Sequence, residues 1–165
     1  MSRNMTPEEF NALVARMKAP ENGVIDAVAP RGGKPFEDAR PANPVKSTSQ
    51  SFFVHGPLPG ANDVLRKHHM VYSRLKSEWG LTIARCILVA KLKRVQACTI
   101  SFLWQEPHNR RDIDNICFGA KFILDALRDT KIIPDDARQF VRAVTHSVVT
   151  EKTNPGCFVR IEEVV

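Results

Sequence analysis

The sequence predicts an α+β domain in which a small mixed sheet packs against two main helices, preceded by a flexible N-terminal extension. Stretches with strand-like alternation and stretches with helical spacing follow one another without a regular rhythm, which favours α+β over a repeating β–α fold. A chain of 165 residues with 43% hydrophobic content can build one core. The first 48 residues differ, because they include a stretch with many prolines and glycines and almost no apolar periodicity.

The N-terminal region is predicted to contain one short helix and a poorly ordered linker. A helix is expected over Thr6–Met17, where the first residue can act as N-cap, Pro7 takes the first helical position and Glu9 completes a capping box. The proline- and glycine-containing stretch that follows has turn and linker character. The chain is therefore divided into an N-terminal region, 1–48, and a folded domain, 49–165.

The first half of the domain is predicted to form a strand, a turn, a long helix and a second strand. The strand covers Ser51–Val54 and stops at Gly56–Gly60, because two prolines and two glycines lie within these five residues. Apolar positions at helical spacing predict a helix over Val71–Lys93. Alternating side chains predict a strand over Gln96–Trp104.

The second half is predicted to form one amphipathic helix and two closing strands. The helix covers Asp112–Arg128, where apolar residues recur every three or four positions. A loop is expected over Lys131–Asp136. Strands are expected over Phe140–Thr150 and Gly156–Val164, separated by an Asn-Pro-Gly turn.

Charge and cysteine content limit the class of protein. A formal charge of +6 favours a polyanionic partner, either nucleic acid or an anionic membrane surface. No apolar run approaches the roughly 20 residues that span a bilayer, and no apolar signal segment follows the start, so we expect a cytoplasmic protein without a membrane partner. The four cysteines have no zinc-type spacing and are expected to be reduced.

Carboxylates gather on both sides of the predicted amphipathic helix. Asp112 and Asp114 lie at its start, and Asp135 and Asp136 lie just beyond its end. Carboxylate oxygens suit Mg²⁺, which keeps several waters and commonly shares substrate phosphate oxygens. A metal held in this way can activate water for attack on a phosphodiester. The same residues also fit a helix cap and a turn, so spacing alone leaves both interpretations open.

Basic residues accompany these carboxylates. Arg110 and Arg111 directly precede the first pair and suit phosphate contacts. On a continuous helix, Lys121 would share a face with Asp114 and Asp125. It is therefore either a clamp for charge that develops on phosphate or a plain ion-pair partner of Asp125. Further candidate DNA contacts, which also fit a solvated surface, are Arg66, Lys67, Arg74 and Lys76.

Several separated motifs together resemble the signature of RusA-like Holliday-junction resolvases, the crossover junction endodeoxyribonucleases. They are R-R-D-I-D-N-I at 110–116, K-F-I-L-D-A-L at 121–127 and I-P-D-D at 133–136. The segment G-P-L-P-G-A-N at 56–62 also resembles the family's turn after its first strand. The resemblance extends over about Ser51–Glu163. It implies a Mg²⁺-dependent homodimeric nuclease that resolves four-way junctions by paired phosphodiester hydrolysis, without a small-molecule cofactor.

The resemblance also implies roles for individual residues. The implied essential metal-binding carboxylates are Asp112, Asp114 and Asp136, with Asp135 as an accessory acid. The family's catalytic lysine follows the motif by four residues in shorter members, a position that Phe118 holds here. Counting back from Asp125 instead identifies Lys121, which implies a three-residue insertion in the helix.

Two other functions remain open from the sequence. One is a branched-DNA-binding protein without catalysis, in which the basic surface binds and the carboxylates only cap a helix and build a turn. The other is a nuclease of the same fold that acts on forks or flaps. The resemblance further implies a phage or prophage context in DNA recombination, repair or packaging.

Overall fold

The structure is a computed structural model that describes residues 48–65 and 69–164, and it confirms the predicted α+β class. In chain order the elements are β1 (Ser49–His55), α2 (Ala61–Leu65), α3 (His69–Val89), β2 (Cys98–Glu106), α4 (Ile113–Cys117), α5 (Ala120–Asp129), β3 (Val141–Thr150) and β4 (Gly156–Glu163). The predicted helix over Thr6–Met17 and the candidate DNA contacts Arg66 and Lys67 lie outside the described residues. Within the described ranges, no helix is both long and apolar enough to cross a membrane.

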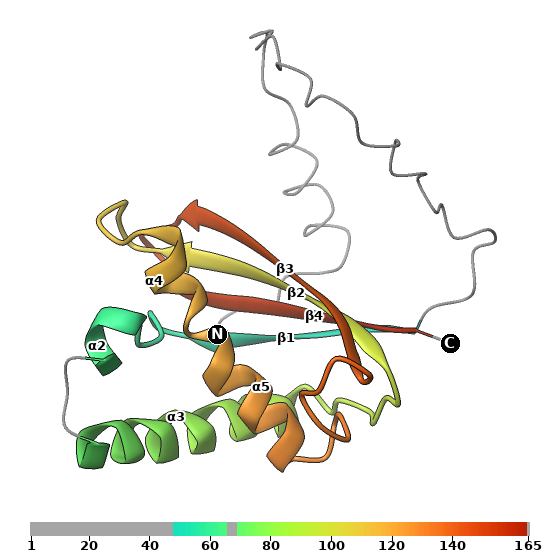
Figure 1. The fold of residues 1–165 in the computed structure, drawn as a ribbon. Coiled ribbons are helices and arrows are strands. Elements are labelled where there is room, and N and C mark those ends of the chain that lie inside the picture. Colours follow the sequence, from blue (N-terminus) through green and yellow to red (C-terminus); the bar gives the residue numbers. More distant parts are fainter. Residues whose placement is uncertain (1–47, 66–68, 165) are drawn as a thin grey trace, which may run out of the picture. The chain divides into compact units, whose positions relative to one another are not determined.

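The four strands form one mixed sheet in the order β1-β4-β2-β3. β4 runs antiparallel to both β1 and β2, whereas β3 runs parallel to β2. Figure 1 shows α3 and α5 on one side of this sheet. Parallel neighbours need a crossover connection, and here the segment that contains α4 and α5 provides it. The predicted acidic residues therefore lie on the connection that joins β2 to β3.

The core lies between the sheet and the two main helices. Alternate residues of β2 face it, because successive side chains of a strand point to opposite faces. The largest side chains buried there include Ile83 and Ile87 of α3, Ile123 and Leu127 of α5, and Ile100, Phe102 and Trp104 of β2. All four cysteines are free thiols, and burial raises the pKa of Cys98 to about 11.

Helix α3 ends earlier than the apolar spacing predicted. It stops at Val89 rather than Lys93, because Lys91 adopts a left-handed conformation with a φ of 53°. The N–H of Leu92 then donates to the carbonyl of Ile87 over 3.4 Å, which closes the helix end. Leu92 packs against the core from this turn. Its apolar side chain therefore belongs to the turn after the helix, although its spacing suggested that the helix continued.

The predicted single helix over Asp112–Arg128 is wrong, because the segment forms two helices. α4 and α5 are separated by Phe118 and Gly119. The N–H of Gly119 donates to the carbonyl three residues back, and the carbonyls of Phe118 and Gly119 accept from the N–H groups three residues on, as in a tighter turn. Gly119 lies against the indole of Trp104: a Cβ at this position would be 3.1 Å from Trp104 Cη2. The chain therefore bends where it passes the core tryptophan.

Helix α2 was not predicted. It begins directly after the turn at Gly56–Gly60 and contains five residues. Asp63 stabilises its start, because its carboxylate accepts a hydrogen bond from the N–H of Gly60 over 2.9 Å. The N–H of Asp63 in turn donates to the carbonyl of Gly60 over 3.1 Å. This reciprocal pair orders the end of the turn that faces the acidic motif.

Candidate active site

Asp112 and Asp114 are two exposed carboxylates at the start of α4. Asp112 occupies the N-cap position with an extended backbone, at φ −72° and ψ 155°, yet its side chain makes no capping hydrogen bond. Asp114 lies in the first turn of α4. Neither side chain forms a hydrogen bond or an ion pair with another described residue. The carboxylate of Asp112 is therefore not used as a helix cap.

Arg111, which precedes this pair, forms a largely buried ion pair with Glu106. Its Nη1 donates to both carboxylate oxygens of Glu106, at 3.2 and 3.3 Å, and its Nη2 donates to the carbonyl of Leu58 over 3.1 Å. The side chains of Arg111 and Glu106 are 17% and 4% exposed. The guanidinium group thus ties the end of β2 and the turn after β1 to the residue before Asp112.

Asn115 holds the other side of the acidic pair. Its Oδ1 accepts a hydrogen bond from the backbone N–H of Asn62 over 3.0 Å. Gly60 also lies close, since a Cβ at this position would be 2.3 Å from Asn115 Oδ1 and 2.5 Å from Arg111 Nη2. The G-P-L-P-G-A-N turn and the R-D-I-D-N motif therefore pack on each other. Arg111 and Asn115 fix the backbone, and the two aspartates between them face solvent.

Gly60→Ala is expected to destabilise the domain by about 1–3 kcal/mol, because the added methyl group would overlap the acidic motif. Gly80→Ala is the matched control. Gly80 lies inside α3, and a methyl group added there would meet open space, so alanine should stabilise the helix by about 0.5–1 kcal/mol. Urea unfolding of both variants measures the difference. Equal effects of the two changes would contradict the tight contact at Gly60.

Lys121 forms the predicted ion pair with Asp125, at 3.8 Å. Asp125 is nearly buried, with a side chain 6% exposed, and has two further cationic partners: Lys76 of α3 at 2.9 Å and Arg128 at 3.4 Å. The contact with Asp125 raises the pKa of Lys76 above its usual value. Lys121 is half exposed and is the most distant of the three. Lys76 therefore joins α3 to α5. The break between α4 and α5 removes the continuous helix on which Lys121 was expected to share a face with Asp114.

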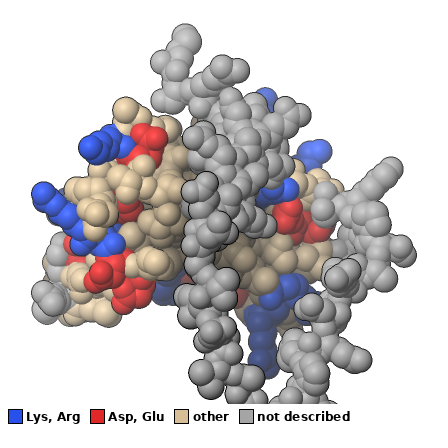
Figure 2. All heavy atoms as spheres, turned by 90° about the horizontal axis from the view of Figure 1, so that it is seen from above, with Lys and Arg blue, Asp and Glu red and all other residues tan. Residues whose placement is uncertain are grey.

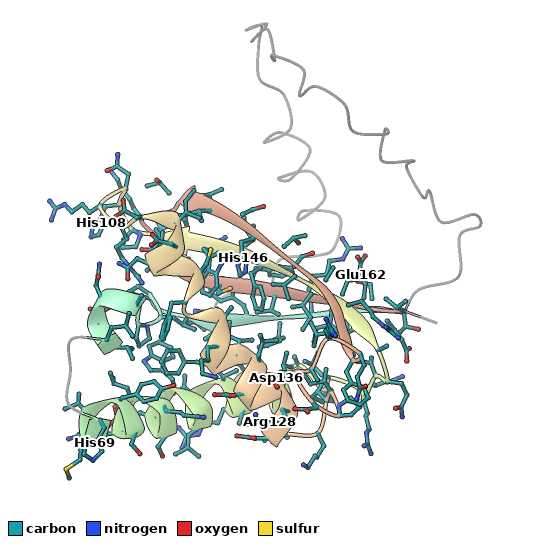
Figure 3. The ribbon with its side chains drawn as sticks, in the orientation of Figure 1. His69, His108, Arg128, Asp136, His146 and Glu162 are labelled. Atoms are coloured by element: carbon teal, nitrogen blue, oxygen red, sulfur yellow. The ribbon has the colours of Figure 1, made fainter. Side chains whose placement is uncertain are left out.

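The second carboxylate pair is arranged differently from the first. Asp135 accepts a hydrogen bond from the backbone N–H of Asp136 over 2.9 Å. Figure 3 places the exposed Asp136 near Arg128 at the end of α5, away from the start of α4. Among the described residues, no three His, Cys, Asp or Glu side chains come close enough to hold one metal ion. The structure thus keeps Asp136 apart from Asp112 and Asp114.

Two further residues that were predicted to contact DNA and that the structure describes, Arg74 and Arg110, lie on the surface. Arg110 is exposed beside the acidic pair, and His108 lies at the tip of the loop between β2 and α4 (Figure 3). Arg74 pairs with Glu78 at 2.7 Å in an exposed i, i+4 contact. Figure 2 shows basic and acidic side chains close together at the end of the domain that carries α2 and α4. A surface of this kind can contact phosphate while it presents carboxylates.

Glu106 is the site residue that the sequence interpretation missed. A usable signal was present, because this acidic residue ends an apolar strand, and a buried carboxylate needs a cationic partner. Arg111, five residues later, was interpreted only as a phosphate contact, whereas the structure shows it holding Glu106 and the turn. Comparison with protein-family models and with curated proteins found no match to this chain.

Proposed function

We propose that this chain is a Mg²⁺-dependent endodeoxyribonuclease that acts on branched DNA, above all on four-way junctions. The proposal rests chiefly on one observation: Asp112 and Asp114 are exposed and unpartnered among the described residues, while both flanking residues are fixed by structural contacts. Aspartates that served only to make the surface polar would not need the backbone on both sides of them to be held by Arg111 and Asn115. The resemblance of the motifs to RusA-like resolvases supports branched DNA as the substrate.

The acidic pair fits a magnesium ion. Mg²⁺ is commonly bound through one or two protein carboxylates together with water and substrate phosphate, and Asp112 and Asp114 offer these hard oxygen ligands to solvent. When bound there, Mg²⁺ supplies a water of lowered pKa and charge neutralisation at the scissile phosphate. Arg110, exposed beside the pair, binds a neighbouring phosphate, and Arg111 positions the two carboxylates.

The active form is proposed to be a homodimer. Resolution of a four-way junction needs two symmetrical nicks, which two copies related by a two-fold axis supply. Each copy contributes one pair of Asp112 and Asp114. Asp136, implied by the resemblance as a third ligand, lies near Arg128 in the isolated chain, so the proposal rests on the first two carboxylates.

The test is a cleavage assay on a labelled mobile four-way junction and a linear duplex of matched sequence, with and without Mg²⁺. We expect paired nicks on the junction only, and only when Mg²⁺ is present. Tight junction binding without cleavage in Mg²⁺ or Mn²⁺ would favour the DNA-binding protein without catalysis. Faster cleavage of forks or flaps than of junctions would favour the other nuclease activity.

Lys121→Ala is expected to slow cleavage about a hundred-fold, because the ammonium group no longer offsets charge that develops on the phosphate. Stability should change by less than about 1 kcal/mol, because the lost ion pair is half exposed and Asp125 keeps Lys76 and Arg128. Single-turnover cleavage and urea unfolding measure the two quantities. Lys121→Arg retains the charge and should recover part of the rate, and an unchanged rate in the alanine variant would leave Lys121 with a structural role only.

A further inference from the structure

A pocket of about 410 Å³ lies beside the residue that precedes Asp112. One wall consists of Leu75 and Trp79 on α3, and His108 and Arg111 line it from the loop between β2 and α4. The rings of Pro57, Pro59 and Pro107 add further apolar surface. The pocket thus combines an apolar and aromatic wall with charged groups from Asp63, Glu106 and Arg111, the last of which directly precedes Asp112 in the chain.

Arg111 lines this pocket with a guanidinium group that structural contacts hold in place. Its two terminal nitrogens are engaged by Glu106 and Leu58, whereas its buried Nε has no hydrogen-bond partner among the described residues. Because this Nε is closed off from solvent, Arg111 contributes a fixed group to the wall of the pocket rather than a free hydrogen-bond donor.

Trp79 supplies the aromatic part of the pocket wall. It is partly buried and packs against the core, and a Cβ placed on Gly56 would lie 3.7 Å from its Cη2. Gly56 has a φ of +86°, a conformation that favours glycine. The indole lines the pocket, and an aromatic surface of this kind suits the stacking of a flat ring.

We propose that this pocket receives an unpaired nucleobase from the strand that is cut at Asp112 and Asp114, an inference that rests on the proposed function. The pocket lies within the size range of small-ligand sites, which is about 300–1,000 Å³. Stacking on an aromatic side chain tolerates any base sequence. A base at a branch point is withdrawn from the stack more readily than a base inside a duplex. The pocket would therefore favour branched over linear DNA.

The two tryptophans of the chain provide a built-in probe. Trp104 is 1% exposed in the core and donates its indole N–H to His146 over 3.0 Å, whereas Trp79 lines the pocket. A base that stacks on Trp79 should quench its fluorescence and leave Trp104 unaffected. The full chain is titrated in EDTA with a four-way junction, a single-stranded oligonucleotide and a linear duplex, while anisotropy of the labelled DNA reports binding.

We expect the junction and the single strand to quench emission, and the duplex to quench it much less. Trp79→Phe should remove the quenching, and Trp79→Ala should weaken junction binding about ten-fold. Leu81→Ala is the control on the same helix, because Leu81 is 62% exposed and lies outside the pocket. Its binding should match that of the unmodified chain.

The outcomes separate this inference from the proposed function. Junction binding without a change in Trp79 emission, or equal quenching by the duplex, would overturn the nucleobase pocket. If the junction is nevertheless cleaved in Mg²⁺, the nuclease proposal stands. Quenching by single strand and junction without any cleavage would support the pocket and overturn the nuclease. Absence of binding to all three DNA molecules would overturn both.

Discussion

Replacing Asp112 with asparagine is expected to lower the rate of junction cleavage at least about a thousand-fold, which corresponds to about 4 kcal/mol in activation free energy. The change removes one anionic oxygen ligand for Mg²⁺ and leaves the size of the side chain almost unchanged. Since Asp112 makes no capping hydrogen bond, the fold should not depend on its carboxylate. Junction affinity should be unchanged or higher, because less negative charge faces the phosphates.

The measurement is single-turnover cleavage in Mg²⁺, together with junction binding in EDTA. Asp114→Asn should give a loss of the same order. Asp129→Asn is the matched control, because it makes the same chemical change on a carboxylate of α5 that is 65% exposed. A loss of binding in the Asp112 variant, or an equal loss of cleavage in the Asp129 variant, would count against a metal-binding role.

Arg111→Met is expected to lower the free energy of unfolding by about 3–5 kcal/mol, because it leaves the buried carboxylate of Glu106 without its partner. The hydrogen bond to the Leu58 carbonyl is lost as well. Urea unfolding measures this effect. A double variant, Arg111→Met with Glu106→Gln, should be less destabilised than the sum of its two single changes, since it removes the stranded charge.

Arg110→Met is the control for this change. Arg110 is exposed, so its stability should change by no more than about 0.5 kcal/mol. Loss of a phosphate contact should instead weaken DNA binding and reduce its salt dependence by about one unit of slope. The change at Arg111 would thus lower mainly the stability of the domain, whereas the change at Arg110 would lower mainly its affinity for DNA. A stability loss no larger for Arg111 than for Arg110 would contradict the buried ion pair.

The elements that were predicted from sequence are those with a regular local pattern. The alternation in β2 and the helical spacing in α3 depend only on near neighbours, and both elements are present. The break between α4 and α5 was missed because it depends on Trp104, which meets Gly119 only in the folded chain. α2 was missed because a five-residue helix has too few positions to show a period.

The candidate site was predicted in part for the same reason. The pair of Asp112 and Asp114 is visible in the sequence because the two residues are local to each other. The contact of Gly60 with Asn115 joins positions far apart in the chain, and neither residue carries a charge pattern that would connect them. The separation of Asp136 from the first pair depends on the path of α5, which spacing along the sequence does not determine.

Because β2 and β3 pair in parallel, the sheet cannot be completed until the connection that carries α4, α5 and the candidate site has formed. β3 can reach its place only after residues 107–140 have crossed the sheet, and pairings between distant segments form slowly. Amide hydrogen exchange in β3 therefore reports on the α4–α5 segment. A substitution that removes only a functional side chain leaves these amides protected, whereas one that displaces the segment lets β3 exchange with solvent.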